Sequence, residues 1–368
     1  MTTQYIIGTG LLGVYATDSL TAPQAWAAAN GGLGSTNIIE IAPEDDNLRQ
    51  YCLDGAALAT RVISTRTTGA WSPILTTAQA RVLTGEADPN STIIDIGVDQ
   101  VNGDVYALFT VESLASTVPL YALRSGDQGG TWAAYVVEAT GRHSVIGNIV
   151  ANNGNVACSS GWRIPGRSTV FVSTDSAATW TPTASFSATR YAAWVFINSY
   201  APTFFYCRGG IAGDDLYRVN FDASTLLLQA GVRPLRPDSM VFEDALTQKV
   251  YDFSTELLHE TANAWGAYTT QAVADQDSIY LDGSTLLFAS DTPSPDILSR
   301  YLGAGAVIGV SGPNPDVVPY VDSIPETCGG VAIRGGFVKG ESVGVFVRNV
   351  FAPQLGRSVS VNTPGVIV

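Results

Sequence analysis

The chain is a succession of short apolar runs separated by turns rich in glycine, asparagine and aspartate. Four runs stand out in the segment 92–137, at residues 93–99, 105–111, 120–125 and from Trp132 onward. Asn102-Gly103 lies between the first two, and both residue types accept positive φ, which favours a tight hairpin. No long segment repeats apolar residues at helical spacing, although 22–29 is compatible with a short turn of helix. The pattern predicts an all-β chain of short antiparallel strands.

Two octapeptides of the form Ser-x-Asp-x-x-x-Thr-Trp occupy the same place in two sets of runs. The first contains Ser125, Asp127, Gly129, Thr131 and Trp132, and the second contains Ser173, Asp175, Thr179 and Trp180. They resemble the Asp box, or BNR repeat, of sialidase-like β-propellers. The resemblance implies a turn whose Asp accepts backbone amide bonds, whose glycines take positive φ and whose Trp packs between sheets. It therefore implies a structural role for these residues.

The four-run unit recurs along the chain with a period of about 36 to 60 residues, a length typical of propeller blades. Six units are complete, at residues 38–75, 92–137, 147–184, 192–230, 239–271 and 278–311. Trp71 and Trp265 open the fourth run of their units, as Trp132 and Trp180 do. Each unit predicts a four-stranded antiparallel blade.

Each end of the chain carries half a unit. Residues 11–29 contain a third and a fourth run, at Leu11 to Asp18 and near Trp26. Residues 329–348 contain a first and a second run, at 329–334 and 342–348. A blade built from both ends pairs sheet edges that would otherwise stay open. The prediction is one domain over 1–368, a seven-bladed β-propeller closed by this composite blade, with 357–368 as a tail strand.

Composition excludes several partners. The net charge is −14, and Lys249 and Lys339 are the only lysines, so phosphate is repelled and no nucleic-acid partner is expected. No apolar run reaches the roughly 18 residues of a membrane helix, so no membrane insertion is expected. The first 18 residues lack the basic region of a signal peptide. We find no phosphate loop, Ser-His-Asp arrangement or dinucleotide fingerprint, and expect no cofactor.

The cysteines are predicted to be small buried thiols. Cys52, Cys158 and Cys207 fall at equivalent points of second strands in different units, and Cys328 is the fourth. Packed sheets lie about 10 Å apart, beyond the roughly 7 Å between Cα atoms that a disulfide spans. His143 and His259 lack a full set of ligands at metal-binding spacing, so we expect surface histidines and no metal site.

In propellers that resemble this chain, the connections from second to third strand and from fourth strand to the next blade share the functional face. The predicted second-to-third connections are 54–60, 112–117, 160–167, 208–215 and 291–296. Residues there or nearby that could bind a ligand are Trp162, Arg163, Arg167, Arg190, Tyr191, Arg208, Asp214 and Asp215. Asp214-Asp215 is also compatible with a solvated turn.

Trp162-Arg163-Ile164-Pro165 resembles the aromatic-Arg-Ile-Pro motif of sialidases. That resemblance implies a carboxylate clamp made by Arg163 and two further arginines, for which Arg190, Arg208 and Arg334 are available. The motif departs from the family pattern because it lies in the third unit, shortly before the second octapeptide, instead of on the first inner strand. No spacing selects the tyrosine nucleophile, glutamate and aspartic acid that a sialidase also needs.

Three functions are compatible with these features. The first is a non-catalytic binding or assembly propeller on a virion, such as a phage tail, or on another extracellular particle. The composition, low in lysine and rich in Thr, Ser, Gly and Ala, is typical of an extracellular surface, whereas the sequence shows no signal peptide. The partners of such a propeller would be other protein subunits, a surface glycan or a receptor. The second is a sialidase-like or other glycoside hydrolase, so enzymatic activity stays open. The third is a cytoplasmic assembly factor that holds a client protein.

Overall fold

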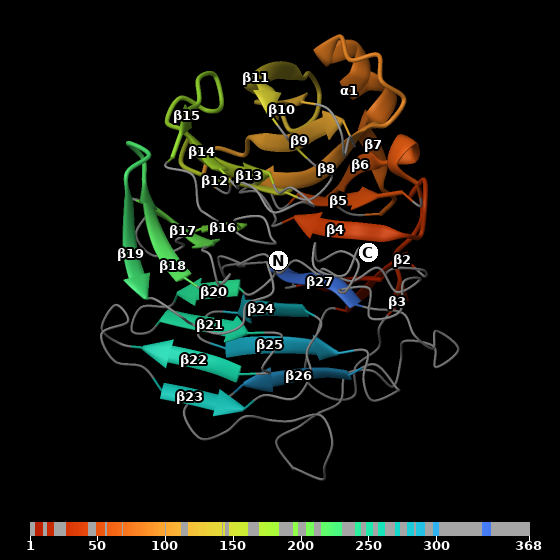
Figure 1. Ribbon diagram of the computed structural model, residues 1–368. Coiled ribbons are helices and arrows are strands. Elements are labelled where there is room, and N and C mark those ends of the chain that lie inside the picture. The colour runs from red at the N-terminus through yellow and green to blue at the C-terminus, as the bar shows by residue number, and fades with distance from the viewer. Residues whose placement is uncertain are drawn as a thin grey trace.

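The computed structural model describes part of the chain, and every structural statement below concerns that part. The described residues are 4–9, 13–17, 27–42, 49–55, 57–67, 69–99, 101–111, 117–141, 143, 147–160, 169–183, 194–197, 204–209, 215–229, 240–243, 248–252, 257–261, 269–272, 278–282, 285–290, 297–301 and 333–339. They form an all-β fold of antiparallel sheets with one α-helix and one 3-10 helix (Figure 1).

The early strands are β1 (Gln4–Thr9), β2 (Gly13–Thr17), β3 (Ala27–Ala28), β4 (Ile38–Ala42), β5 (Gln50–Asp54), β6 (Val62–Arg66), β7 (Ser72–Thr76), β8 (Ser91–Val98), β9 (Val105–Val111), β10 (Val118–Ser125), β11 (Ala133–Gly141), β12 (Gly147–Asn152), β13 (Asn155–Ser160), β14 (Thr169–Ser173) and β15 (Thr181–Pro182). The later strands are β16 (Trp194–Ile197), β17 (Phe204–Gly209), β18 (Asp215–Asn220), β19 (Thr225–Gln229), β20 (Met240–Glu243), β21 (Gln248–Asp252), β22 (Leu257–Thr261), β23 (Thr269–Ala272), β24 (Ser278–Asp282), β25 (Thr285–Ser290), β26 (Ile297–Tyr301) and β27 (Ile333–Lys339). The helices are η1 (Leu58–Thr60) and α1 (Thr77–Thr84).

Consecutive strands pair to form separate sheets. The four-stranded sheets are β4–β7, β8–β11, β12–β15, β16–β19 and β20–β23, and the described strands of the next are β24–β26. Their strands fall inside the predicted repeat units, and the hairpin at Asn102-Gly103 joins β8 to β9 as expected. Trp71 immediately precedes β7, whereas Trp265 lies outside the described residues.

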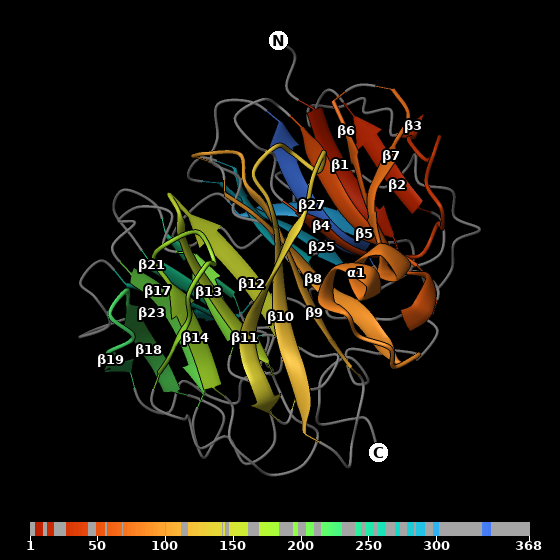
Figure 2. The same ribbon diagram turned by 90° about the horizontal axis from the view of Figure 1, so that it is seen from above.

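The sheets are arranged in a propeller-like way. The first strand of each sheet contacts the first strand of the next, from β4 through β8, β12 and β16 to β20, and β27 contacts both β24 and β4. Figures 1 and 2 show these strands toward the middle of the molecule, with later strands of each sheet farther out. The face-to-face packing of adjacent sheets buries the apolar side chains of both.

One sheet combines β1, β2 and β3, from the first 28 residues, with β27, from residues 333–339. Its strand order is β27-β1-β2-β3, and we call it the terminal sheet. The prediction gave its first two strands to 329–334 and 342–348, and this division is wrong for the second strand, which is β1. The first strand, β27, starts four residues later than predicted, and 342–348 lies outside the described residues. Because β1 is a short run near the start of the chain whose partner β27 is more than 300 residues away, no local pattern reveals the pairing.

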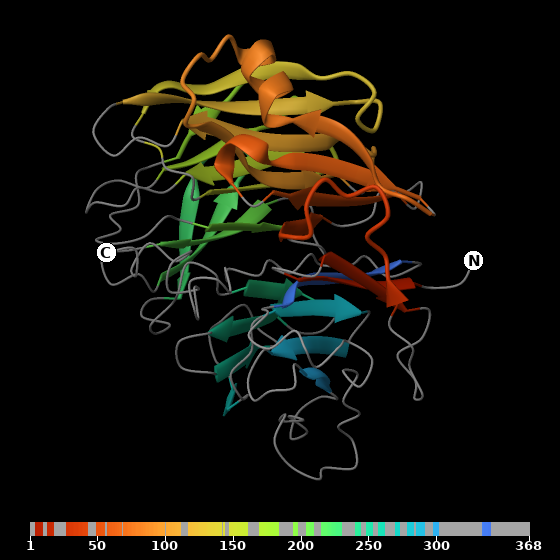
Figure 3. The ribbon, with the colours of Figure 1, turned by 90° about the vertical axis from the view of Figure 1, so that its right-hand side faces the viewer.

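Helix placement also differs from the expectation. Ala27 and Ala28 of the predicted helical turn form β3, while 22–26 lies outside the described residues. Helix α1 follows β7 instead, at the periphery of the molecule (Figure 3). Its N-terminus is fixed by a capping box in which the Thr76 hydroxyl accepts a bond from the Gln79 amide, and Gly85 ends it at φ 70°. These short-range caps were a readable sign of the helix that apolar periodicity missed.

The β4–β7 sheet packs on a neighbour at each face. Tyr51, Leu53 and Ile63 point to the β8–β11 sheet, where they join Phe109 in an apolar cluster. Cys52, on the other face of β5, joins Val14 and Ala16 of the terminal sheet. We call the first the apolar interface and the second the terminal seam. Cys52, Cys158 and Cys207 lie in second strands of their sheets as predicted, and the thiols of Cys52 and Cys158 are buried and unpaired.

Candidate functional site

The antiparallel order gives each sheet two ends. Connections from second to third strand and from fourth strand to the next sheet emerge at one end, which we call the connection face. Of the predicted connections, 54–60 is described apart from residue 56, while most of 112–117, 160–167, 208–215 and 291–296 lies outside the described residues. The described part of this face is built by residues 29–37, by η1 and by α1 with the turn that follows it.

The predicted ligand-binding residues are described only in part. Arg208 lies near the end of β17 and Asp215 begins β18, so both positions open on the connection face. Gly209 pairs with Asp215, which places Arg208 one residue from that pair along the strand. Six candidates lie outside the described residues: Trp162, Arg163, Arg167, Arg190, Tyr191 and Asp214. Whether the whole set converges is therefore a prediction.

Side-chain hydrogen bonds join η1 and α1 to the start of β8 on the connection face. The Thr92 hydroxyl donates to the Leu58 carbonyl at 2.6 Å, and Arg61 Nη1 donates to the Ile93 carbonyl at 2.8 Å. Arg81 of α1 donates through Nε to the Ser91 hydroxyl at 2.8 Å, and through Nη2 to the Ser91 carbonyl at the same distance. These cations stabilise backbone carbonyls at the start of β8.

Two exposed aliphatic side chains of α1 lie beside these bonds. Val82 of α1 is 83% exposed and Leu83 is 40% exposed. Ala57 and Ala59 beside η1 are exposed as well, and α1 contacts η1. Exposed aliphatic side chains that gather on one face favour contact with another apolar surface.

Asp54 is the buried carboxyl of this face. It ends β5, its residue is fully buried, and neither oxygen has a hydrogen bond of ordinary geometry within the described residues. Burial raises the pKa of Asp54 to about 6, although the nearby Ser64 hydroxyl and the backbone amides of Ser35 and Gly34 act to lower it. The sequence placed Asp54 at a connection but did not indicate its burial, because the segment that links β3 to β4 covers the carboxyl.

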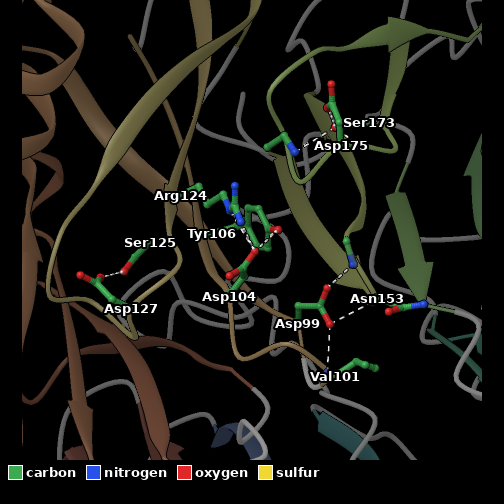
Figure 4. Close-up of polar contacts among 12 residues, drawn as sticks. Asp99, Val101, Asp104, Tyr106, Arg124, Ser125, Asp127, Asn153, Ser173 and Asp175 are labelled. Atoms are coloured by element: carbon green, nitrogen blue, oxygen red, sulfur yellow. Dashed lines mark hydrogen bonds and ion pairs between the residues drawn. The ribbon is translucent and has the colours of Figure 1, made fainter.

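The two octapeptide turns lie at the opposite end of the sheets and share one hydrogen-bond pattern (Figure 4). In the first, Asp127 Oδ1 accepts from the Thr131 amide at 2.7 Å, and the Ser125 hydroxyl accepts from the Gly129 amide at 2.7 Å. In the second, Asp175 Oδ1 accepts from the Thr179 amide at 2.8 Å, and the Ser173 hydroxyl accepts from the Ala177 amide at 2.9 Å. The carboxylates satisfy the amides of their own turns.

The charge of each turn is stabilised by these bonds. The Thr131 amide, followed by the Ser125 and Thr131 hydroxyls, lowers the pKa of Asp127 to about 2. The Thr179 hydroxyl and amide lower the pKa of Asp175 in the same way. Trp132 reaches the neighbouring sheet, where its indole N–H donates to the Ile74 carbonyl at 3.0 Å. The turns thus fix hairpins and link sheets.

A third turn of related chemistry was missed by the sequence reading. Between β18 and β19, Asp222 Oδ1 accepts from the Ser224 amide at 2.9 Å, and Ala223 takes φ 64°. The Ser224 bonds lower the pKa of Asp222. The turn occupies the same third-to-fourth connection as the octapeptides. It is shorter and has no Thr-Trp ending, so the motif does not match it.

Two further acids join strands at this end of the sheets (Figure 4). Asp99 accepts from the Asn153 amide at 2.9 Å and from the Gly154 amide at 2.6 Å, which ties the β8–β11 sheet to the first hairpin of the next. Asp104 Oδ2 accepts from Arg124 Nε at 2.9 Å and from the Tyr106 hydroxyl at 3.1 Å. Burial, with the Asp104 charge, raises the pKa of Tyr106.

The expectation of a surface position for His143 is wrong. Its side chain is 2% exposed, and Nε2 lies 3.1 Å from Glu138 Oε2, at the end of β11. His259 lies in β22 without a described side chain. Within the described residues, no group of three His, Cys, Asp or Glu side chains could hold a metal ion, and no helix is long and apolar enough to cross a membrane.

Comparison with known proteins finds similar structures but no matching family. No family model matches the chain, and no curated protein matches its sequence. A functionally unknown protein from Desulfotomaculum acetoxidans DSM 771 has a similar structure, with a TM-score of 0.55 and 14% identity over 90% of this chain and 99% of that one. At this identity the likeness shows the fold alone.

Two enzymes are more distant in structure. The GH74 xyloglucanase from Xanthomonas campestris has a TM-score of 0.48 and 16% identity, over 77% of this chain and 45% of that one. A Hadza microbial sialidase has a TM-score of 0.45 and 12% identity, over 68% of this chain and 62% of that one. This chain thus spans less than two thirds of either enzyme.

Proposed function

We propose that the chain is a seven-bladed β-propeller that acts as a non-catalytic binding or assembly module. The described strands fall into seven sheets, and the terminal sheet joins β1 to β27, which supports a ring closed by strands from both ends. In this proposal the turns at Asp127 and Asp175 are Asp boxes. They hold the scaffold, while the connection face binds.

The proposed partner is another protein subunit, and the exposed pair Val82 and Leu83 carries this choice. In a chain with net charge −14, α1 presents these two aliphatic side chains, and Arg81 on the same helix is engaged with the Ser91 carbonyl. The acids Glu86 and Asp88 follow in the next turn, at the edge of the pair. Depletion of charge is typical of the centre of a protein interface. A nucleic acid is a poor candidate for the same acidic chain.

A virion, such as a phage particle, is the proposed setting. The composition, low in lysine and rich in small polar residues, suits an extracellular surface, and a virion assembles inside the cell before it works outside. Mass spectrometry of purified, protease-digested particles tests this placement. Peptides of the chain are expected there, and their absence from particles while the protein persists in the cytoplasm would favour the assembly-factor alternative.

The binding face is tested by charge substitution. Replacing Val82→Glu and Leu83→Glu together is expected to remove the chain from assembled particles without loss of folding, since both side chains are exposed. Val101→Glu is the matched control, because Val101 is 57% exposed on a first-to-second-strand turn at the opposite end of the sheets. Equal incorporation of the double variant and the control would exclude this face.

Glycan hydrolysis is the alternative function. Its supporting observation is that Arg208 lies near the end of β17 and Arg334 near the start of β27, and both strand ends open on the connection face. Arg163 and Arg190 would join them in a carboxylate clamp. Turnover of a fluorogenic sialoside that is lost in both Arg163→Ala and Arg208→Ala would favour this enzyme over the binding module.

A further inference from the structure

The terminal seam contains a line of buried polar side chains on the adjacent strands β5 and β6. Gln50, Cys52 and Asp54 alternate along β5 toward the terminal sheet, and Ser64 and Arg66 lie beside them on β6. All five residues are at least 93% buried. At one end of the line, Arg66 Nε donates to Gln50 Oε1 at 2.7 Å.

Asp54 lies at the other end of that line. Neither carboxylate oxygen has a hydrogen bond of ordinary geometry within the described residues, and the Ser64 hydroxyl is unpartnered by the same measure. Gly34 lies against Asp54 Oδ1, so the carboxyl is covered by the segment that links β3 to β4. A buried carboxylate without full hydrogen bonding is costly, whereas the neutral acid is tolerated.

The charged groups on the elements around Asp54 are few. On β4, Glu40 is buried and pairs with Leu53, whose side chain is on the other face of β5, and Arg61 before β6 donates to the Ile93 carbonyl of the next sheet. On β5 the titratable neighbour is Cys52, and on β6 Arg66 lies two residues beyond Ser64, where its guanidinium is 4.7 Å from the ring centroid of Trp71. The described residues 27–37 present no charged side chain, and Val14 and Ala16 of β2 are apolar. β27 carries Arg334 and Lys339, and β1 carries Tyr5, with side chains outside the described part.

We propose that Asp54 is a proton-operated latch on the terminal seam: the neutral carboxyl keeps the terminal sheet packed on β4–β7, and its ionisation favours opening. The proposal rests on the packing of these two sheets and is independent of the proposed function. It gives the molecule a seam that is tightest in acid.

The direction follows from the two protonation equilibria. The pKa of Asp54 is raised to about 6 in the folded chain, above the ordinary value of 3.8 that applies once the seam is open. The open state therefore loses its proton first as pH rises, and the closed seam loses stability between about pH 4 and pH 6. A difference of about two pKa units corresponds to a change of about 100-fold in the opening equilibrium.

Hydrogen exchange of the full-length chain at pH 4.5 and pH 7.5, corrected for the intrinsic pH dependence of exchange, tests the latch. Peptides covering 27–37 and β5–β6 are expected to lose about 20-fold in protection between pH 4.5 and pH 7.5, because part of the change is already complete at pH 4.5, while peptides of β9–β10 change much less. Asp54→Asn, which stays neutral, is expected to keep the seam closed at both pH values.

A second variant tests the latch independently of Asp54→Asn, and a third serves as a control. Ser64→Ala removes a hydroxyl that lowers the pKa of Asp54, so it is expected to move the loss of protection to higher pH even if Asp54→Asn does not fold. Asp127→Asn, at the opposite end of the sheets, is expected to leave the seam unchanged. Seam protection that is independent of pH would overturn the latch, as would a pH dependence that persists in Asp54→Asn.

Discussion

The two faces of the β4–β7 sheet are packed by different means. At the apolar interface, Leu53 and Ile63 meet Phe109 in a large apolar cluster, and Glu40 and Thr65 are the buried polar residues on this face of β4 and β6. At the terminal seam, directional bonds add to a smaller apolar cluster: the Trp71 indole N–H donates to the Ala29 carbonyl at 2.7 Å, and Arg66 stacks on the same ring. The difference indicates that apolar area contributes more at the apolar interface, whereas directional polar contacts contribute a larger share of the packing at the terminal seam.

Truncation of Phe109 gives the largest expected effect. Phe109→Ala empties a fully buried site at the apolar interface and is expected to cost about 3–5 kcal/mol of unfolding free energy. Val14→Ala, a buried truncation at the terminal seam, is expected to cost about 1–2 kcal/mol. Urea denaturation of both variants measures the two losses of unfolding free energy. Equal losses would contradict the proposed difference between the two faces.

Asp99→Asn tests whether a polar link holds consecutive sheets as well. The amide group would present a donor where Asp99 now accepts from the Asn153 and Gly154 amides, and the expected cost is about 2–3 kcal/mol. Asp222→Asn is the control, because that exposed carboxylate binds only within its own turn. Equal thermal stability of the two variants would mean that Asp99 does not link the sheets.

Trp71 and Trp132 make the same kind of link at the two interfaces, because each donates an indole N–H to a carbonyl in or beside the preceding sheet. Trp71→Phe at the terminal seam also loses part of the contact with Arg66, and is expected to cost about 1–2 kcal/mol. Trp132→Phe loses a bond of 3.0 Å at a half-buried site, and is expected to cost about 0.5–1 kcal/mol. A larger loss of unfolding free energy for Trp132→Phe than for Trp71→Phe in chemical denaturation would contradict the greater role of polar contacts at the terminal seam.

Acid is expected to act on the exposed turns in the direction opposite to its effect on Asp54. The pKa of Asp127 is lowered to about 2, so its contribution to stability is present above about pH 4 and is lost as pH falls toward 2. Asp127→Asn should therefore melt below the wild-type chain at pH 5 and converge with it near pH 2. Melting temperatures over this range measure the effect, and a constant gap would contradict it.

Much of the fold could be predicted from the sequence because short-range chemistry encodes it. The Asn102-Gly103 hairpin and the Ser-x-Asp turns mark strand ends, and apolar runs mark the strands between them. Non-local features escaped: β1 pairs with the distant β27, and His143 is buried against the end of a strand. Their environments come from segments far away in the sequence, which local patterns do not record.

The candidate site was predicted less completely than the fold. The position of Arg208 near a strand end on the connection face follows from strand order alone. Convergence of Arg163, Arg190 and Arg208 depends on how long connections fold, and no periodic pattern encodes that. The buried state of Asp54 likewise depends on the covering segment that links β3 to β4.

The closed ring is tested most directly by a cross-link between β1 and β27, the paired strands that are farthest apart in the sequence. Ile6 pairs with Phe337, and a cysteine pair at these positions, Ile6→Cys with Phe337→Cys, should form a disulfide within one chain on mild oxidation. Peptide mapping under non-reducing conditions identifies the bond, with Ile6→Cys alone as the control. We expect the disulfide between the two substituted positions in the monomer, and its absence, or its formation only between chains, would contradict the closed ring.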